Sequence, residues 1–131
     1  MSDPEPGVWL GDDGILRVRY PPNCHLTLDV VEKVHRRHLD ITRTPCPLLV
    51  YAESVASAEY DAQQFSSRDE VAAVVRAMGI IVKSAFTRAM AELFMRFHRP
   101  PYPTRVFRDE QAALEWLARY MGEDSAPRAD G

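Results

Sequence analysis

The stretch LLVYA, residues 48–52, decides the predicted fold class of this chain. It is short and continuously apolar, and the preceding Thr44-Pro45-Cys46-Pro47 interrupts any helix. Because no polar residue alternates along it, the stretch predicts a strand buried on both faces. A second run of this kind is Ile80-Ile81-Val82. Buried strands separated by helices are typical of an α/β fold with parallel strands, which we therefore predict.

The residues before this strand predict a β-hairpin and a helix. Val8-Trp9-Leu10 and the stretch 15–20 flank an Asp13-Gly14 turn, and apolar and basic residues alternate along the second stretch. This turn chemistry and this period of two indicate an antiparallel hairpin with one solvated face. Thr27 is a suitable N-cap for a helix that continues to about Leu39.

The residues after the strand begin with a polar connection over 53–66. Ser67, with Glu70 three positions later, matches a capping box, so we predict that a helix begins there and that Gly79 ends it. The inner stripe of this helix is expected to consist of Val71, Val74, Val75 and Met78.

The last third of the chain predicts two helices around one strand. Ser84 or Thr87 caps a helix that runs to about Phe97, 104–107 is a strand, and Asp109 caps the final helix. The predicted order is β-β-α-β-α-β-α-β-α, a mixed sheet of an N-terminal hairpin and parallel strands packed against about four helices.

Length and composition predict one globular domain. The chain has 131 residues, of which 46% are hydrophobic and 27% charged. We expect a disordered N-terminus over 1–7, a single domain over 8–121 and a disordered tail over 122–131. The net charge is −3, but the excess of acidic over basic residues lies at the two ends, so the central part of the chain carries a small net positive charge.

The sequence predicts a cytoplasmic protein. The start MSDPEPG lacks the basic and apolar segments of a signal peptide, and no apolar run is long enough to span a membrane. Cys24 and Cys46 form no CxxC pair, which favours a reducing compartment. We expect no membrane insertion.

The second half of the chain resembles a family of small bacterial proteins. The matching residues are MGIIVKS (78–84), Phe94, PPYPTRVF (100–107), Glu110, Ala113 and EWL (115–117). Those proteins are described as STAS-like or as related to the CRAL-TRIO lipid-binding fold. The element order also resembles the STAS fold of bacterial anti-sigma-factor antagonists. The resemblance covers roughly residues 67–120 and implies a regulatory module rather than an enzyme.

One feature of regulatory STAS domains is not reproduced. Their Asp-Ser-Ser-Gly-like loop, which carries a phosphorylated serine, is replaced after the central strand by Glu53-Ser54-Val55-Ala56-Ser57. Ser66 and Ser67 come later, at the predicted start of a helix, where free amides favour a phosphate. They are the candidate phosphorylation sites, and the alternative is that Ser67 is only a helix cap.

No residue pattern predicts catalysis, a metal site or a bound cofactor. Glu32, His35 and His38 share a helix face, but a second Glu-x-x-His motif, which a di-iron site needs, does not occur. A partly buried histidine pair is the alternative. No G-x-S-x-G, P-loop or G-x-G-x-x-G pattern is present.

An arginine cluster is a candidate anion-binding site. Five arginines and the single acid Glu92 lie within 86–108, and the candidate site residues are Arg88, Arg96, Arg99 and Arg105. Arginine beside aromatic residues suits anionic partners, although we do not expect nucleic acid. The alternative is a solvated arginine-rich face.

The sequence therefore predicts a non-catalytic regulatory or adaptor module that acts through protein–protein contact. We expect no enzymatic activity, because no catalytic motif is present. The helix over 86–97 is apolar on more than one side, so we predict a homodimer whose interface includes Phe94, Met95 and Tyr102. One alternative function is the binding of a small, lipid-like ligand in an apolar pocket between the sheet and the helices. The other is the binding of an anionic partner through the arginine cluster.

Overall fold

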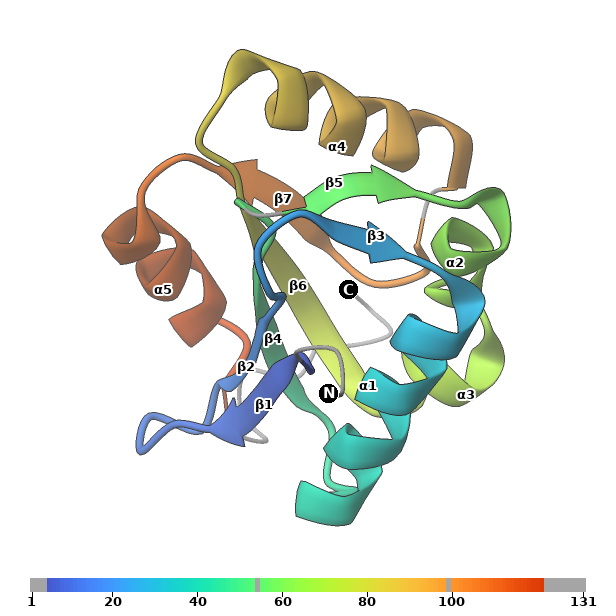
Figure 1. The fold of residues 1–131 in the computed structure, drawn as a ribbon. Coiled ribbons are helices and arrows are strands. Elements are labelled where there is room, and N and C mark those ends of the chain that lie inside the picture. The colour runs from blue at the N-terminus through green and yellow to red at the C-terminus, as the bar shows by residue number, and fades with distance from the viewer. Residues whose placement is uncertain (1–4, 54, 99, 122–131) are drawn as a thin grey trace.

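The protein is described by a computed structural model over residues 5–53, 55–98 and 100–121 (Figure 1). The strands are β1 (Gly7–Leu10), β2 (Leu16–Arg19), β3 (Cys24–Leu26), β4 (Cys46–Tyr51), β5 (Val55–Ala58), β6 (Val75–Ile81) and β7 (Thr104–Phe107). The helices are α1 (Leu28–Ile41), α2 (Tyr60–Phe65), α3 (Asp69–Ala72), α4 (Ala85–His98) and α5 (Glu110–Ala118).

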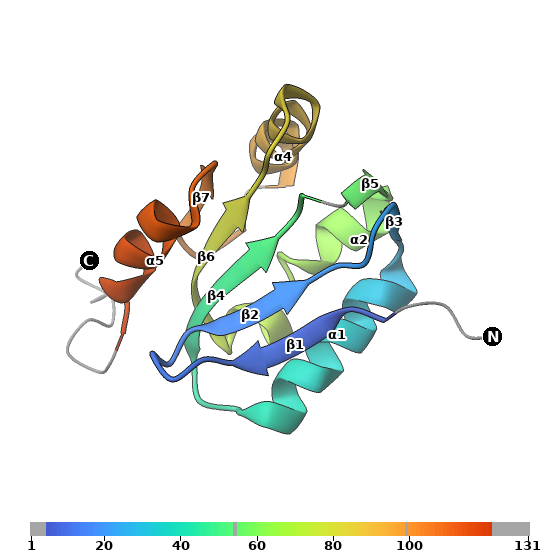
Figure 2. The ribbon, with the colours of Figure 1, turned by 60° about the vertical axis from the view of Figure 1, so that its left-hand side comes forward.

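The main sheet has five strands in the order β1-β2-β4-β6-β7 (Figure 2). β1 is antiparallel to β2, and the pairs β2–β4, β4–β6 and β6–β7 are parallel. β3 and β5 form a separate parallel pair. The predicted α/β fold, with an N-terminal hairpin and parallel strands in one mixed sheet, is therefore confirmed.

The helices are divided unequally between the two faces of the sheet (Figures 1 and 2). From β2 to β4, β6 and β7 the chain always advances in the same direction across the sheet. Right-handed crossovers therefore place α1 to α4, and the β3–β5 pair, on one face. α5 follows the last strand and packs on the opposite face against β4, β6 and β7.

Local signals explain the ends of several elements. Gly14 closes the β1–β2 turn with φ of 82°, a conformation that favours glycine. The side chain of Thr27 accepts a hydrogen bond from the Val30 amide at 3.2 Å, and that of Asp109 accepts one from the Ala112 amide at 3.0 Å. Both predicted N-caps are therefore confirmed.

The helix predicted from Ser67 to Met78 is wrong. α3 covers only Asp69–Ala72, its N-cap is Arg68 without a side-chain hydrogen bond, and β6 begins at Val75. Val71 remains in α3, whereas Val75 and Met78 are strand residues, because β6 pairs with both β4 and β7. These pairings are non-local contacts that the helical spacing does not report.

The segment 53–66, which was predicted to be a polar connection, contains the strand β5 and the helix α2. The strand β3, earlier in the chain, was also not predicted. All three are short. β5 and β3 pair with each other across about thirty residues of sequence, as the match of His25 with Ser57 shows. A pair this short has too few residues for a clear alternation.

Two hydrophobic clusters fill the two sides of the sheet. The cluster on the α1–α4 side includes Leu16, Val18, Tyr20, Leu48, Phe65, Val71, Val75 and Tyr102. The cluster under α5 includes Ile15, Leu49, Tyr51, Ala77, Ile81, Ala113, Trp116 and Leu117.

The chain ends are described only in part. Of the segment predicted to be disordered, residues 1–4 lie outside the described residues, and so does the predicted tail, 122–131. Pro6 is buried, and its carbonyl accepts a hydrogen bond from Arg37 at 2.9 Å. Gly7 is the first residue of β1.

Candidate functional site

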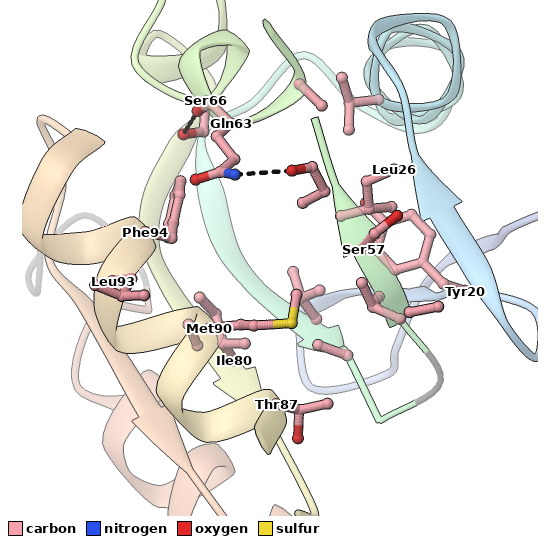
Figure 3. Close-up of a pocket in the computed structure, with 18 of the residues that line it drawn as sticks. Tyr20, Leu26, Ser57, Gln63, Ser66, Ile80, Thr87, Met90, Leu93 and Phe94 are labelled. Carbon is pink, nitrogen blue, oxygen red and sulfur yellow. Dashed lines mark hydrogen bonds between the residues drawn. The ribbon is translucent and has the colours of Figure 1, made fainter. Parts of the chain in front are cut away.

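A cavity of about 460 Å³ lies between α4 and the main sheet (Figure 3). Its floor is formed by residues near the carboxyl ends of the parallel strands, such as Val50 and Ile80. β5 and α2 supply other walls. In open α/β sheets, ligands bind outside the carboxyl ends of the strands, so the position is that of a binding site.

Small side chains and a helix that stands away from the sheet create this space. Five alanines line it: Ala52, Ala56, Ala58, Ala62 and Ala91. α4 contributes Phe86, Met90, Leu93 and Phe94 to the opposite wall (Figure 3). Phe86 is 64% exposed and Leu93 50% exposed, so these large side chains line the cavity without closing it.

The lining is apolar, and none of the described residues that form it carries a charged side chain. Its polar members are Tyr20, Ser57, Gln63, Ser66 and Thr87. The amide of Gln63 donates a hydrogen bond to the Ala58 carbonyl at 2.9 Å, and the Ser66 hydroxyl donates to the Gln63 carbonyl at 2.9 Å (Figure 3). A site of this composition suits an apolar ligand, since an ion would lose its hydration without a counter-charge.

Tyr20 is the most buried of the polar lining residues, at 8% exposure. It follows the last residue of β2 and lies across the cavity from α4 (Figure 3). Burial raises the pKa of its hydroxyl, and the nearby Cys24 adds to that effect. The hydroxyl is therefore protonated at neutral pH and can donate a hydrogen bond.

A smaller cavity of about 90 Å³ adjoins the first and shares Tyr20 and Ser66 with it. His35 and His38 of α1 line its far side. Burial lowers the pKa of His38 to about 4, with a further contribution from His35, and burial also lowers the pKa of His35. Both rings are therefore neutral at pH 7.

The two histidines form the buried pair that the sequence suggested as the alternative to a metal site. Their rings meet edge to face at 6.3 Å, and His38 Nε2 lies 3.9 Å from Cys46 Sγ. Among the described residues, no group of three or more His, Cys, Asp or Glu side chains could hold a metal ion. Cys24 and Cys46 are free and buried.

The predicted phosphorylation sites are not at a helix N-terminus. Ser66 is the C-cap of α2 and lines the cavity, and Ser67 follows it, before the Arg68 cap of α3. The capping argument for Ser67 is therefore wrong. Phosphorylation of Ser66 or Ser67 stays a prediction, now without that support.

The predicted interface residues have different environments. Tyr102 is buried at 7% exposure, and its hydroxyl donates a hydrogen bond to the Ser66 carbonyl at 3.0 Å. It therefore cannot present its ring to a partner. Phe94 lines the cavity, and Met95 is half-buried. Among the α4 residues whose side chains are described, the most exposed large apolar ones are instead Phe86 and Leu93.

The arginines predicted to form one anion-binding site are spread over the molecule. Arg88 is paired with Glu92 on α4 at 3.0 Å, and Arg96 is exposed on the same helix. Arg105 lies over the rings of Phe107 and Trp116, on the α5 side of the sheet. Arg99 lies outside the described residues. The described arginines do not form a single cluster, so that prediction loses its geometric basis.

Sequence reasoning missed most of the cavity. Tyr20 belongs to the alternating stretch 15–20, for which only a strand was predicted. The alanines of β5 and α2 fell in the segment predicted to be a polar connection. The only available signal was the density of alanine and serine in Ala52–Ala62, where small side chains leave room beside a sheet.

The comparisons with known proteins establish the family. A family model described as a domain of unknown function, DUF7793, matches residues 8–121. The chain belongs to this family. No curated protein matches it.

A solved structure supports the fold. An uncharacterized protein of the DUF3478 family from Shewanella loihica PV-4, with a SpoIIAA-like fold, is 20% identical, with a TM-score of 0.60 over 89% of this chain and 98% of that one. The STAS-like fold is therefore confirmed, whereas the CRAL-TRIO relation stays a prediction. A protein with unknown function from Arthrobacter sp. FB24 is 26% identical over 86% and 98% of the two chains, but its TM-score of 0.32 supports no argument.

In the described part of the chain, no helix is both long enough and apolar enough to cross a lipid bilayer.

Proposed function

We propose that this protein is a non-catalytic binding module that takes a small apolar molecule into the cavity under α4. The observation that supports the proposal is the cavity of about 460 Å³, which is apolar, uncharged and open at the carboxyl ends of the parallel strands. Proteins normally pack such a space to high density, so a void of this size beside a sheet suggests a ligand.

The non-catalytic part of the proposal rests on the chemistry of the lining. Its hydroxyl groups belong to Tyr20, Ser57, Ser66 and Thr87, and within the described part of the chain no cysteine, histidine or carboxylate lines the larger cavity. A serine nucleophile needs an adjacent base. The one such contact at the lining joins Ser57 Oγ to His25 Nδ1 at 2.6 Å, and no carboxylate orients that ring among the hydrogen bonds of the described residues.

A neutral fluorophore that brightens in apolar surroundings, N-phenyl-1-naphthylamine, tests the proposal. We expect saturable binding of about one molecule per chain. Ala91→Phe places an aromatic ring in the cavity and should weaken binding at least fivefold. Ala118→Phe adds the same ring at an exposed position of α5 and should leave binding unchanged. Absence of saturable binding, or equal binding by the two variants, would contradict the proposal.

Contact with a protein partner is the second candidate function, and a different observation supports it. Phe86 and Leu93 expose large apolar surfaces on α4. The resemblance to anti-sigma-factor antagonists supports a regulatory role for such contact. Because the same two residues line the cavity, ligand and partner would share one helix.

Light scattering over a concentration series tests the case in which the partner is a second copy. A dimer that dissociates in a Leu93→Glu variant would support self-association through α4. A mass that stays at 14.9 kDa at every concentration would exclude it.

A further inference from the structure

The hydroxyl of Tyr20 differs from the other polar groups of the cavity. Each of the other four polar lining side chains makes a hydrogen bond within the protein, at distances of 2.6 to 3.1 Å. Tyr20 is only 8% exposed, yet its hydroxyl has no hydrogen-bond partner among the described residues. A buried hydroxyl in this state carries a desolvation cost that a bound group can remove.

This hydroxyl is accessible from the space inside the protein rather than sealed. Among the described residues, every side-chain oxygen or nitrogen that is fully sealed from solvent has a partner. The unpartnered oxygen of Tyr20 is therefore not sealed, and the spaces that the residue lines are the two adjoining cavities. Figure 3 places Tyr20 beside Leu26 and Ser57, across the cavity from Met90 and Phe94 of α4.

The charge of the lining restricts what this hydroxyl can bind. None of the residues that the structure describes around the larger cavity is charged, so a carboxylate, phosphate or ammonium head would be desolvated without compensation. Burial raises the pKa of Tyr20, so the residue offers a neutral O–H donor and a neutral oxygen acceptor. The matching head is an uncharged oxygen group, and a hydroxyl is the one that can both accept a hydrogen bond from Tyr20 and donate one to it.

The size of the cavity restricts the rest of the ligand. At about 30 Å³ for each heavy atom, the share that a water molecule takes in the liquid, 460 Å³ holds about fifteen heavy atoms. The chain's own remaining end does not suit the space, because residues 122–131 include Glu123, Asp124, Arg128 and Asp130.

We infer that the ligand is an uncharged amphipathic molecule with a single hydroxyl head, of the long-chain alcohol class, and that its head hydrogen-bonds to Tyr20 while its chain fills the space under α4. This inference rests on the proposed function and specifies its ligand class. It makes Tyr20 the specificity-determining residue of the cavity.

Competition against the bound fluorophore tests the inference with three probes at pH 8. The probes are 1-decanol, 1-fluorodecane, in which a fluorine replaces the hydroxyl, and decanoate, which carries a charge. They are measured on the wild type, on Tyr20→Phe, and on Tyr60→Phe, which removes the hydroxyl of an exposed tyrosine. Thermal unfolding of the three proteins checks that each is folded.

We expect Tyr20→Phe to raise the Kd of 1-decanol by roughly 3–10-fold, the value of one lost hydrogen bond. The Kd of 1-fluorodecane should not rise, and Tyr60→Phe should change neither value. Decanoate should bind at least tenfold more weakly than 1-decanol. Because the lost hydroxyl has no partner in the protein, Tyr20→Phe should not lower the unfolding temperature.

The outcomes separate the inference from the proposed function. Both 1-decanol and 1-fluorodecane could displace the fluorophore while Tyr20→Phe changes their Kd values equally. The cavity would then bind apolar molecules without recognising a hydroxyl, and only the inference would fail. Decanoate binding as tightly as 1-decanol would also overturn it. If no probe and no fluorophore binds, the proposed function and the inference fail together. Unfolding of Tyr20→Phe would show a structural role for the hydroxyl and reject the inference.

Discussion

The two faces of the main sheet are covered in different ways. On one face, α5 packs directly onto the strands, and Leu117 and Ala113 are completely buried. On the other face, α4 leaves a cavity, and its Phe86 and Leu93 remain exposed. A single sheet thus has one face that provides stability and another that keeps space for a ligand.

A glycine accounts for part of this difference. Gly79 lies within β6, and a Cβ atom built on it would be 3.3 Å from Leu117 Cδ1 and 3.6 Å from Phe107 Cε2. The missing side chain lets α5 approach the strand closely. Met78 and Ile80, which precede and follow Gly79, lie on the opposite face of the strand and line the cavity.

The largest expected effect comes from removing a packed side chain on the α5 face. Leu117→Ala should lower the free energy of unfolding by about 2–5 kcal/mol, because the site is fully buried and leaves a void. Leu93→Ala on α4 should cost less than about 0.5 kcal/mol, because that side chain is half exposed. Urea denaturation measures both, and similar losses would contradict the contrast between the faces.

A second effect concerns pH and the buried His38 on the cavity side. Its pKa is about 4 in the folded protein, below the ordinary value of 6.5, because burial opposes the charged form. The unfolded chain therefore binds the proton first as the pH falls, so stability present above pH 6.5 is lost between about pH 6.5 and 4, by roughly 2–3 kcal/mol.

Unfolding free energies measured from pH 7 to 4.5 test this expectation. His38→Leu should flatten the dependence, although His35, whose pKa is lowered in the same direction, retains part of it. The control is His25→Gln, at an exposed position, which should keep the full slope. A wild-type slope that His38→Leu does not change would show that another group is responsible.

The smallest of the three expected effects is the change in stability when a side chain is enlarged on either face of the sheet. Gly79→Val should destabilise the protein by about 1–3 kcal/mol, because its methyl groups meet Leu117 and Phe107. Ala52→Val adds methyl groups to the cavity lining and should change stability by less than about 0.5 kcal/mol. Thermal and urea unfolding of the two variants give the comparison, and an equal cost would mean that the cavity side is packed as tightly.

Much of the fold could be predicted from local patterns. The apolar stretch LLVYA gave the central strand, and the turn at Gly14 and the caps at Thr27 and Asp109 set the ends of the hairpin and of two helices. Each of these signals depends on a few neighbouring residues, so it can be recognised in the sequence without knowledge of the tertiary structure.

A residue pattern that is compatible with both a helix and a strand could not be assigned from the sequence alone. Val71, Val74, Val75 and Met78 have helical spacing, but from Val75 onwards they belong to β6. Pairing with β4 and β7 decided that outcome, and both partners are distant in the sequence. The same limit applied to β3 and β5, which, among the described strands, pair only with each other and are distant in the sequence.

The sequence by itself determined a mixed α/β sheet with a hairpin at one edge, because alternation, apolar runs and caps are local properties of the chain. Only the tertiary structure decided the site. Gln63, Ile80 and Met90 come from three different elements, and Tyr20 follows a fourth, β2. The four residues meet only when α4 crosses above the strand ends. A cavity is the space left between packed elements, so no single segment of the sequence encodes it.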